Sequence, residues 1–277
     1  MARAGIYPTL RDAYLRFERN DGSAMAGYIA FSALLAVFPF LIFAVAFAGT
    51  VIGAERSQQA VDALFQFLPD HVALTLEPVL FEVLQDRGQG IWTFSFLAAI
   101  WIASNALEAF RTAFDRAYDV EETRSFFLRR AIAIGFVFVG GAVAVILGVS
   151  IIFTPLLIQA AEGWLKFAVP YGTTTLSFLL GFAVFLGFLT ALHRFLPGRS
   201  MAGEAVWPGV LSSALLWLVV ALGFSFYLSL APSYTITYGA LSGVVVTLLF
   251  FYLSGVVVIF GAELNATLAG RATSNPT

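Results

Sequence analysis

A row of polar side chains marks the end of one long apolar stretch of this sequence. The row consists of Asn105, Glu108, Arg111 and Asp115. Steps of three and four residues place such side chains on one face of a helix, where they can form a ladder of ion pairs. Glu263 and Asn265 end another apolar stretch and are expected at a similar depth. Because an ionisable group at a membrane is costly and normally has a partner or faces a cavity, Glu108, Arg111 and Glu263 form the candidate polar cluster. The alternative is that the cluster is structural, since charges at the interface reach water cheaply.

The sequence predicts no catalytic, metal or cofactor site. Metal-dependent hydrolysis gathers histidines and carboxylates at one place. The two histidines, His71 and His193, belong to opposite sides of the topology derived below, and both are expected at loop ends. Cysteine is absent, which excludes disulfides and thiolate ligands. Phosphate-binding glycine loops, nucleophile elbows and basic aromatic patches are also absent, so we expect neither an enzyme nor a nucleic-acid partner.

Six long apolar stretches must position the polar residues. They run from Met25 to Ile52, Ile91 to Phe110, Ala131 to Gln159, Thr174 to Leu192, Ala205 to Leu230 and Gly239 to Ala262. Each reaches the roughly 20 residues that a helix needs to cross about 30 Å of hydrocarbon. With 60% hydrophobic and 12% charged residues, the chain is too apolar for a soluble core. The sequence predicts an all-α, polytopic membrane bundle of six transmembrane helices, forming a single domain over residues 1–277.

The basic residues set the orientation of this bundle. With the amino terminus inside, 12 of the 15 basic residues fall on the inner side, and only Arg56, Arg87 and Lys166 fall outside. The positive-inside rule then predicts an inner-membrane protein with a cytoplasmic segment over 1–24 and a cytoplasmic tail over 271–277. A cleavable signal peptide is the competing interpretation of the first stretch. That stretch is too long, and begins too far from the amino terminus, for a usual signal.

The connection from residue 53 to residue 90 is expected to form two short amphipathic helices outside the membrane. Apolar residues recur at helical spacing on both sides of Pro69. The polar sides are acidic, whereas a helix that binds an anionic lipid surface is normally rich in Lys and Arg. These helices are therefore expected to cap the mouth of the bundle or to bind an envelope protein partner.

Two features of the spans concern helix shape and helix packing. Pro39 lies near the middle of the first span, where its ring and its missing N–H predict a bend or a broken helix. Such a discontinuity can line a transport site, or it can simply shape the packing. Gly239 with Gly243 and Ala183 with Gly187 have the four-residue spacing that predicts close contact between helices.

Short motifs occur in order along nearly the whole chain. They contain Asp21, Gly22, Tyr28 and Phe38 at the first span, Pro208 and Gly209 at the fifth, Tyr238 and Gly239 before the sixth, and the string from Gly261 to Ala266. In this order and spacing the motifs resemble the YihY/BrkB family of bacterial inner-membrane proteins. One departure is Phe251 before Tyr252, where many relatives have Trp.

The resemblance implies little about mechanism. The family was formerly labelled ribonuclease BN, a label later regarded as mistaken. Some members are linked to virulence or serum resistance, and others look like transporters of envelope lipids or of lipopolysaccharide precursors. The missing hydrolytic residues argue against ribonuclease activity in this chain.

Two function classes follow from the sequence. In the first, the bundle transports or flips an envelope lipid or another amphiphile through a groove that the bend at Pro39 helps to open, with membrane lipids as its partners. In the second, the protein is a noncatalytic envelope scaffold that binds a partner through residues 53–90. The bent first span and the polar rim favour transport, whereas the scarcity of charges deep in the bundle favours the scaffold.

Overall fold

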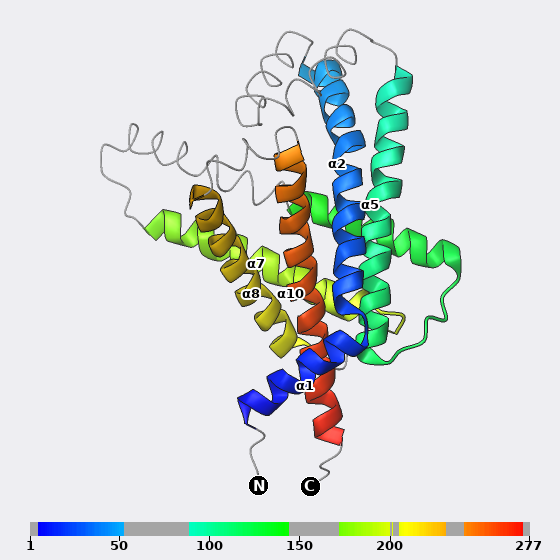
Figure 1. Cartoon of the computed structure of the whole chain (residues 1–277). Helices are drawn as coiled ribbons and strands as arrows, with labels where there is room; N and C mark the ends of the chain where they lie inside the picture. Colours follow the sequence, from blue (N-terminus) through cyan, green and yellow to red (C-terminus); the bar gives the residue numbers. More distant parts are fainter. Residues whose placement is uncertain are drawn as a thin grey trace. The chain divides into compact units, whose positions relative to one another are not determined.

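The computed structural model describes residues 5–52, 89–143, 172–199, 201, 205–230 and 241–273. These residues form helices joined by short turns, and none of them lies in a strand. The helices are α1 (Ile6–Arg19), α2 (Gly22–Ile52), α5 (Gln89–Tyr118), α7 (Gly172–Phe195), α8 (Trp207–Leu230) and α10 (Leu241–Thr273). A further helix covers Phe126–Val143 (Figure 1). The all-α prediction is confirmed.

Apart from α1, the described helices overlap the six predicted apolar stretches. Four parts are long and apolar enough to cross a membrane: Thr93–Tyr118, Phe126–Val143, Trp207–Tyr227 and Gly243–Gly270. Two shorter apolar parts are Gly22–Val37 and Leu179–Phe195. The chain is thus a polytopic helical membrane protein. α5 and α10 run further than predicted, because polar residues at their ends find partners and continue the helices beyond the apolar stretches.

The contacts within the chain divide it into two compact units. Unit 1 comprises Met1–Asn20, Arg111–Leu216 and Val258–Thr277, and unit 2 comprises Asp21–Phe110 and Trp217–Val257. Unit 1 therefore contains α1, helix Phe126–Val143, α7, the start of α8 and the polar ends of α5 and α10. Unit 2 contains α2 and the apolar parts of α5, α8 and α10.

Unit 2 is packed as membrane bundles are, with small residues inside and large residues outside. Ala26 and Ala30 of α2 are buried, whereas Tyr28 and Phe31 are exposed. A Cβ added to Gly255 of α10 would lie 3.2 Å from the Cα of Ala26, so the two backbones approach closely. Small residues permit this approach, and the large exposed side chains suit contact with lipid.

Unit 1 has a core of small and aliphatic side chains contributed by several helices. Its fully buried members include Ala13 of α1, Ala117 of α5, Val210 and Ala214 of α8 and Ala262 of α10. Helix Phe126–Val143 packs on α7 through the rings of Phe136 and Phe188, whose centroids are 6.4 Å apart. Buried alanines let the helix backbones come close, which brings the polar groups at the helix ends within reach of one another.

Two predictions about the spans are corrected by the structure. α2 runs through Pro39 without a break, so the alternative of a broken helix is wrong. The predicted close contact at Ala183 and Gly187 is also wrong. Both residues are exposed on α7, and no described atom lies within 4 Å of a Cβ added at Gly187.

Other predictions fall outside the described residues. Residues 53–88, which carry the predicted outer helices, are among these, as is the segment 231–240. The outer helices and the roles of Tyr238 and Gly239 therefore stay predictions.

Candidate functional site

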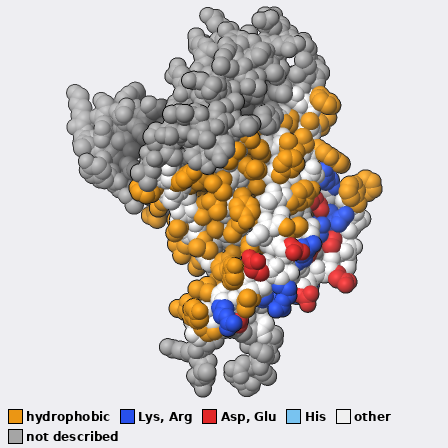
Figure 2. Space-filling view, in the orientation of Figure 1, with side chains coloured by type: hydrophobic (Ala, Val, Ile, Leu, Met, Phe, Trp, Pro, Cys, Tyr) orange, Lys and Arg blue, Asp and Glu red, His pale blue; other side chains and the backbone are white. Residues whose placement is uncertain are grey.

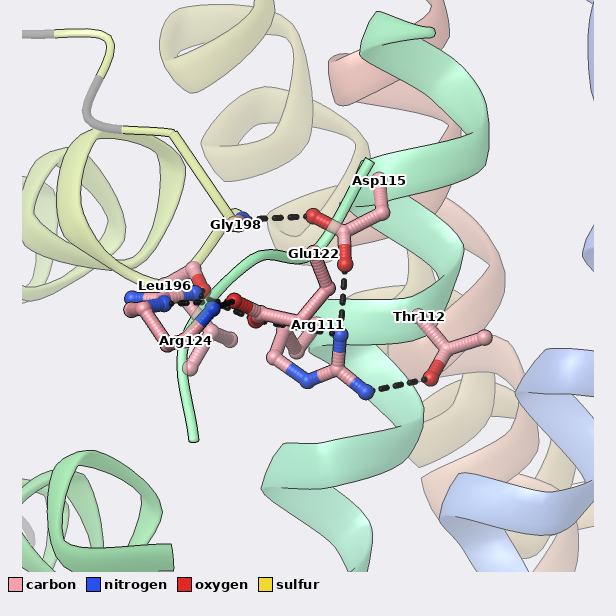
Figure 3. Close-up of polar contacts among 7 residues, drawn as sticks. All are labelled: Arg111, Thr112, Asp115, Glu122, Arg124, Leu196 and Gly198. Atoms are coloured by element: carbon pink, nitrogen blue, oxygen red, sulfur yellow. Dashed lines mark hydrogen bonds and ion pairs between the residues drawn. The ribbon is translucent and has the colours of Figure 1, made fainter. Parts of the chain in front are cut away.

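The polar end of α5 carries a network of ion pairs (Figure 3). Arg111 Nη1 lies 2.6 Å from Asp115 Oδ2, one turn along the helix, and 3.3 Å from Glu122 Oε2 beyond the helix end. Glu122 also accepts hydrogen bonds of 2.8 to 2.9 Å from the backbone N–H and the guanidinium of Arg124. Two arginines and two carboxylates thus form a charge-balanced group with little exposure to solvent.

This network joins α5 to the turn that follows α7. The Gly198 N–H donates to Asp115 Oδ1 at 2.6 Å, and Arg124 Nη2 donates to the Leu196 carbonyl at 3.0 Å. A Cβ on Gly198 would lie 3.0 Å from the Cα of Glu122, so glycine permits the close approach. Removing one member would leave a poorly solvated charge without its partner, and this dependence is typical of a structural network.

The chain reverses direction between the two arginines. Asp119 has a φ of 53° and ends α5 in the left-handed conformation, which Asp adopts more readily than most residues. The Val120 N–H then donates to the Asp115 carbonyl at 2.9 Å, as in a Schellman helix end. The reversal brings Glu122 back to Arg111.

Glu122 lies outside the membrane-spanning helices and is held in its ionised form. Partial burial acts to raise the pKa of the Glu122 carboxyl, but hydrogen bonds from Arg124 and the charges of Arg124 and Arg111 outweigh burial. Together, burial, the hydrogen bonds and the charges lower this pKa from 4.5 to about 2. Glu122 is therefore charged at neutral pH.

We expect the stability of the detergent-solubilised protein to fall as the pH drops from 4.5 towards about 2. Because the folded-state pKa is depressed, the stabilisation is complete above the unfolded-state value and is lost as the pH falls through the folded-state value. A shift from 4.5 to about 2 corresponds to at most about 3 kcal/mol. Thermal unfolding at stepped pH measures the loss. Glu122→Gln should show a shallower pH dependence in this window, and identical profiles for the two proteins would contradict the assignment.

A second network joins α1 to the ends of α5 and α10. Arg16 Nε donates to Glu263 Oε2 at 3.2 Å, and Arg16 Nη2 donates to the Ala117 carbonyl at 2.7 Å. Asn20 Nδ2 donates to Glu263 Oε1 at 2.6 Å. The Glu263 side chain is completely buried, whereas that of Arg16 is 35% exposed. Arg16 therefore neutralises a buried carboxylate and also satisfies a carbonyl that α5 leaves unpaired at its C-terminal end.

Asn265 of α10 caps the start of α8. Its Oδ1 accepts a hydrogen bond of 2.6 Å from the Gly209 N–H, and its Nδ2 donates to the Val206 carbonyl at 2.9 Å. Val206, which precedes the helix, has no side-chain oxygen, and Pro208 has no N–H. Asn265 thus supplies from another helix the hydrogen bond that a local N-cap residue normally makes.

Two glycines bring α8 and α10 into direct backbone contact. A Cβ on Gly209 would collide with the Gly261 carbonyl oxygen and with the side chain of Asn265. A Cβ on Gly261 would collide with Ser213 Oγ and would press on the Gly209 carbonyl. Glycine at both positions is therefore required for this contact, which holds Asn265 at capping distance.

Tyr118 and His193 extend the buried polar group around Asn265. The Tyr118 hydroxyl lies 3.0 Å from His193 Nδ1 and accepts a hydrogen bond of 3.3 Å from Asn265 Nδ2. His193 is fully buried in the last turn of α7, and its ring centroid lies 4.8 Å from that of Phe114. The expectation that His193 ends a loop is wrong, because helix packing encloses it. His71 lies outside the described residues.

In the structure, the residues of the predicted polar cluster belong to different networks. Arg111 belongs to the ion-pair network, Glu263 to the network of α1, and Asn265 to the cap of α8. Asn105 and Glu108 lie on the α5 part of unit 2, where both are half-buried. The described hydrogen bonds of Arg111 and Glu263 thus lead to different partners rather than to a shared site.

The remaining motif residues of the first span lie at the junction of α1 and α2 and along α2. Asp21 has a φ of 57° and lies between the two helices, and the buried Gly22 begins α2. Tyr28 is exposed on α2, which also contains Phe38. Asp tolerates the left-handed conformation that a tight helix junction requires.

The described contacts of the site join helix ends to one another. Among the residues that the structure describes, no three His, Asp or Glu side chains are grouped as a metal site requires. The short hydrogen bonds link the ends of α1, α5, α8 and α10 and the turn after α7. We define these ends of unit 1 as the polar end of the bundle.

Comparison with known proteins finds relatives along nearly the whole chain. A family profile described as Virulence factor BrkB matches residues 13–277. The chain is 30% identical over 282 residues to the ribonuclease-like protein YfkH of Bacillus subtilis, covering 95% of each protein. It is 27% identical over 254 residues to a UPF0761 membrane protein of Pseudoalteromonas translucida, covering 88% of this chain and 80% of that relative. No solved structure matches the chain.

Proposed function

We propose that this chain, which belongs to the BrkB virulence-factor family of membrane proteins, moves or flips an envelope lipid or a similar amphiphile. The family is not a known enzyme class. The ribonuclease-like name of YfkH describes that relative alone, and ribonuclease activity is no part of the proposal.

The position of the ionisable residues carries the proposal. α2 and α8 contain no Asp, Glu, Lys, Arg or His. In α5, α7 and α10 these residues begin only at Glu108, His193 and Glu263, and in helix Phe126–Val143 they end at Arg130. The apolar lengths of the described helices therefore offer no carboxylate, ammonium or imidazole at which a coupling proton or cation could bind.

An apolar path suits a substrate with an apolar body. Leu215, Val219, Leu222 and Phe226 follow one another at helical spacing along α8, and all are strongly exposed. Acyl chains can lie along such a stripe. Because the ionisable groups of the described spans are confined to their polar ends, we propose that the amphiphile moves down its own gradient, while the polar end holds the helices together.

We further propose that the polar end faces the cytoplasm and that the protein lies in the inner membrane. The support is the distribution of basic residues, 12 of 15 on the side of the termini. Both termini are then cytoplasmic.

Lipid transfer in proteoliposomes tests the proposed function. The full chain is reconstituted in vesicles of phosphatidylethanolamine and phosphatidylglycerol that contain a trace of lipid with a fluorescent nitrobenzoxadiazole headgroup. Dithionite added outside bleaches only the outer leaflet unless lipid crosses. We expect nearly complete bleaching in vesicles that contain the protein, without any ion gradient, and about half in protein-free vesicles.

Two outcomes would contradict the proposal. Bleaching equal to that of protein-free vesicles, with every envelope lipid tried, would favour the noncatalytic scaffold. Transfer that requires an imposed proton or sodium gradient would show that the movement is coupled, against the proposal drawn from the described spans.

A further inference from the structure

The amino-terminal helix α1 packs into unit 1 through one face only. Thr9, Ala13 and Phe17 are buried, and each lies four residues from the next, one helical turn apart. Arg16 and Asn20, on the same side, reach Glu263 of α10. This face is therefore fully accounted for by contacts within the protein.

A second apolar face of α1 lies beside the first and is exposed. Ile6 and Tyr7 are 81% and 79% exposed, and Leu10 and Tyr14 are 43% and 53% exposed. At about 100° per residue, these four side chains occupy a sector of about 100° next to the buried face. Hydrophobic side chains are visible over this part of the molecule in Figure 2. A contiguous apolar face of this kind marks an interaction surface.

The hydrogen bonds of Arg16 hold α1 near the ends of two apolar helices. Glu263 lies in the last part of the apolar stretch Gly243–Gly270 of α10. Arg16 also bonds the Ala117 carbonyl, at the end of the apolar stretch Thr93–Tyr118. α1 is thus held where two spans leave the hydrocarbon.

The direction of α1 agrees with this depth. Figure 1 shows α1 crossing α10 at an angle, rather than continuing along it, before α10 ends. A helix held at this angle near the ends of the spans is placed to lie at the membrane surface. Its free apolar face then meets the zone between headgroups and acyl chains, where Tyr side chains are favoured.

We infer that α1 is an interfacial helix whose exposed face, Ile6, Tyr7, Leu10 and Tyr14, binds the lipid surface of the same bilayer. Its outer polar residues are balanced in charge, with Arg11 and Arg19 against Asp12 and Glu18. Apolar contact rather than attraction to anionic lipid therefore supplies the binding. The inference does not rest on lipid transport, because an interfacial helix serves a transporter and a scaffold equally.

Fluorescence quenching along α1 tests the inference. The chain has no cysteine, so single cysteines can carry a nitrobenzoxadiazole label at Tyr7, Leu10 and Tyr14, and at Arg11 and Arg19 as matched controls on the polar face. All five variants keep the buried face and Arg16. Each full-length variant is reconstituted in phosphatidylcholine vesicles, with and without phosphatidylglycerol. Quenching is measured with lipid-attached doxyl groups and with aqueous iodide, in variants that melt like the unlabelled protein.

We expect doxyl quenching to be about threefold stronger at Leu10 and Tyr14 than at Arg11 and Arg19. We expect the reverse order with iodide, and the same pattern in both kinds of vesicle. Equal quenching at all positions would overturn the inference. Shielding of the apolar positions from both quenchers would show that a second copy of the chain covers the face. Doxyl quenching only with phosphatidylglycerol would show that charge, not apolar contact, holds the helix.

Discussion

Replacing Arg16 with Met is expected to lower the free energy of unfolding by about 3–5 kcal/mol, the range for removing one partner of a buried ion pair. The loss is large because the Glu263 carboxylate is completely buried and, among the described residues, would keep the hydrogen bond from Asn20 alone. The Ala117 carbonyl at the end of α5 would lose its donor as well. Thermal or denaturant unfolding in detergent, with the abundance of membrane-inserted protein, measures the effect.

The matched variant is Glu263→Gln, which removes the charge on the other side of the pair. It should cost less than Arg16→Met, because the Arg16 side chain is 35% exposed and can reach water when its partner is neutral. The double variant should recover part of the stability lost in Arg16→Met. A double variant whose loss equals the sum of the two single losses would show that the two residues do not interact.

Adding one methyl group at Gly209 is expected to destabilise the protein by about 2–4 kcal/mol, since overpacking and loss of a helix cap combine. The new Cβ in Gly209→Ala would collide with the Gly261 carbonyl oxygen and with the side chain of Asn265. α8 and α10 must then separate, and the Gly209 N–H loses its 2.6 Å hydrogen bond. Unfolding in detergent measures this effect too.

Gly187→Ala on α7 is the control for this prediction. No described atom lies within 4 Å of the added Cβ, so the substitution is expected to be neutral or stabilising by up to about 1 kcal/mol from helix propensity. Equal melting temperatures for Gly209→Ala and Gly187→Ala would contradict direct backbone contact between α8 and α10.

The helices were predictable from the sequence because hydrocarbon imposes a strict requirement on each span. Long apolar stretches must form helices there, and the described helices confirm all six stretches over the residues described. Helix α1 was not predicted. It is short and only half apolar, and its packing depends on Arg16 and Asn20 meeting Glu263, which is more than 240 residues away in the sequence.

The polar partners were only partly predictable for the same reason. Spacing along one helix indicates the pair of Arg111 and Asp115, which the structure joins at 2.6 Å. Spacing does not indicate partners outside the helix. One such partner of Arg111 is Glu122, which the Schellman turn at the end of α5 brings close to it.

The close glycine contact is not indicated by small residues that are paired within one helix. Here each helix contributes one glycine, Gly209 from α8 and Gly261 from α10. Gly209 belongs to a family motif with Pro208 at the start of α8. The motif alone does not show that this glycine packs against α10, because that contact forms only in the folded chain.

The central claim is that amphiphiles move along the apolar spans while the polar end serves only to hold the helices. Lipid transfer per folded, inserted protein tests it most directly in two variants. Pro39→Ala restores an N–H within the continuous α2 and should lower the rate at normal abundance, by resisting a bend of that span. Glu263→Gln should lower abundance but leave the rate per folded protein unchanged. A normal rate in Pro39→Ala together with a lost rate in well-folded Glu263→Gln would contradict the account and place the pathway at the polar end.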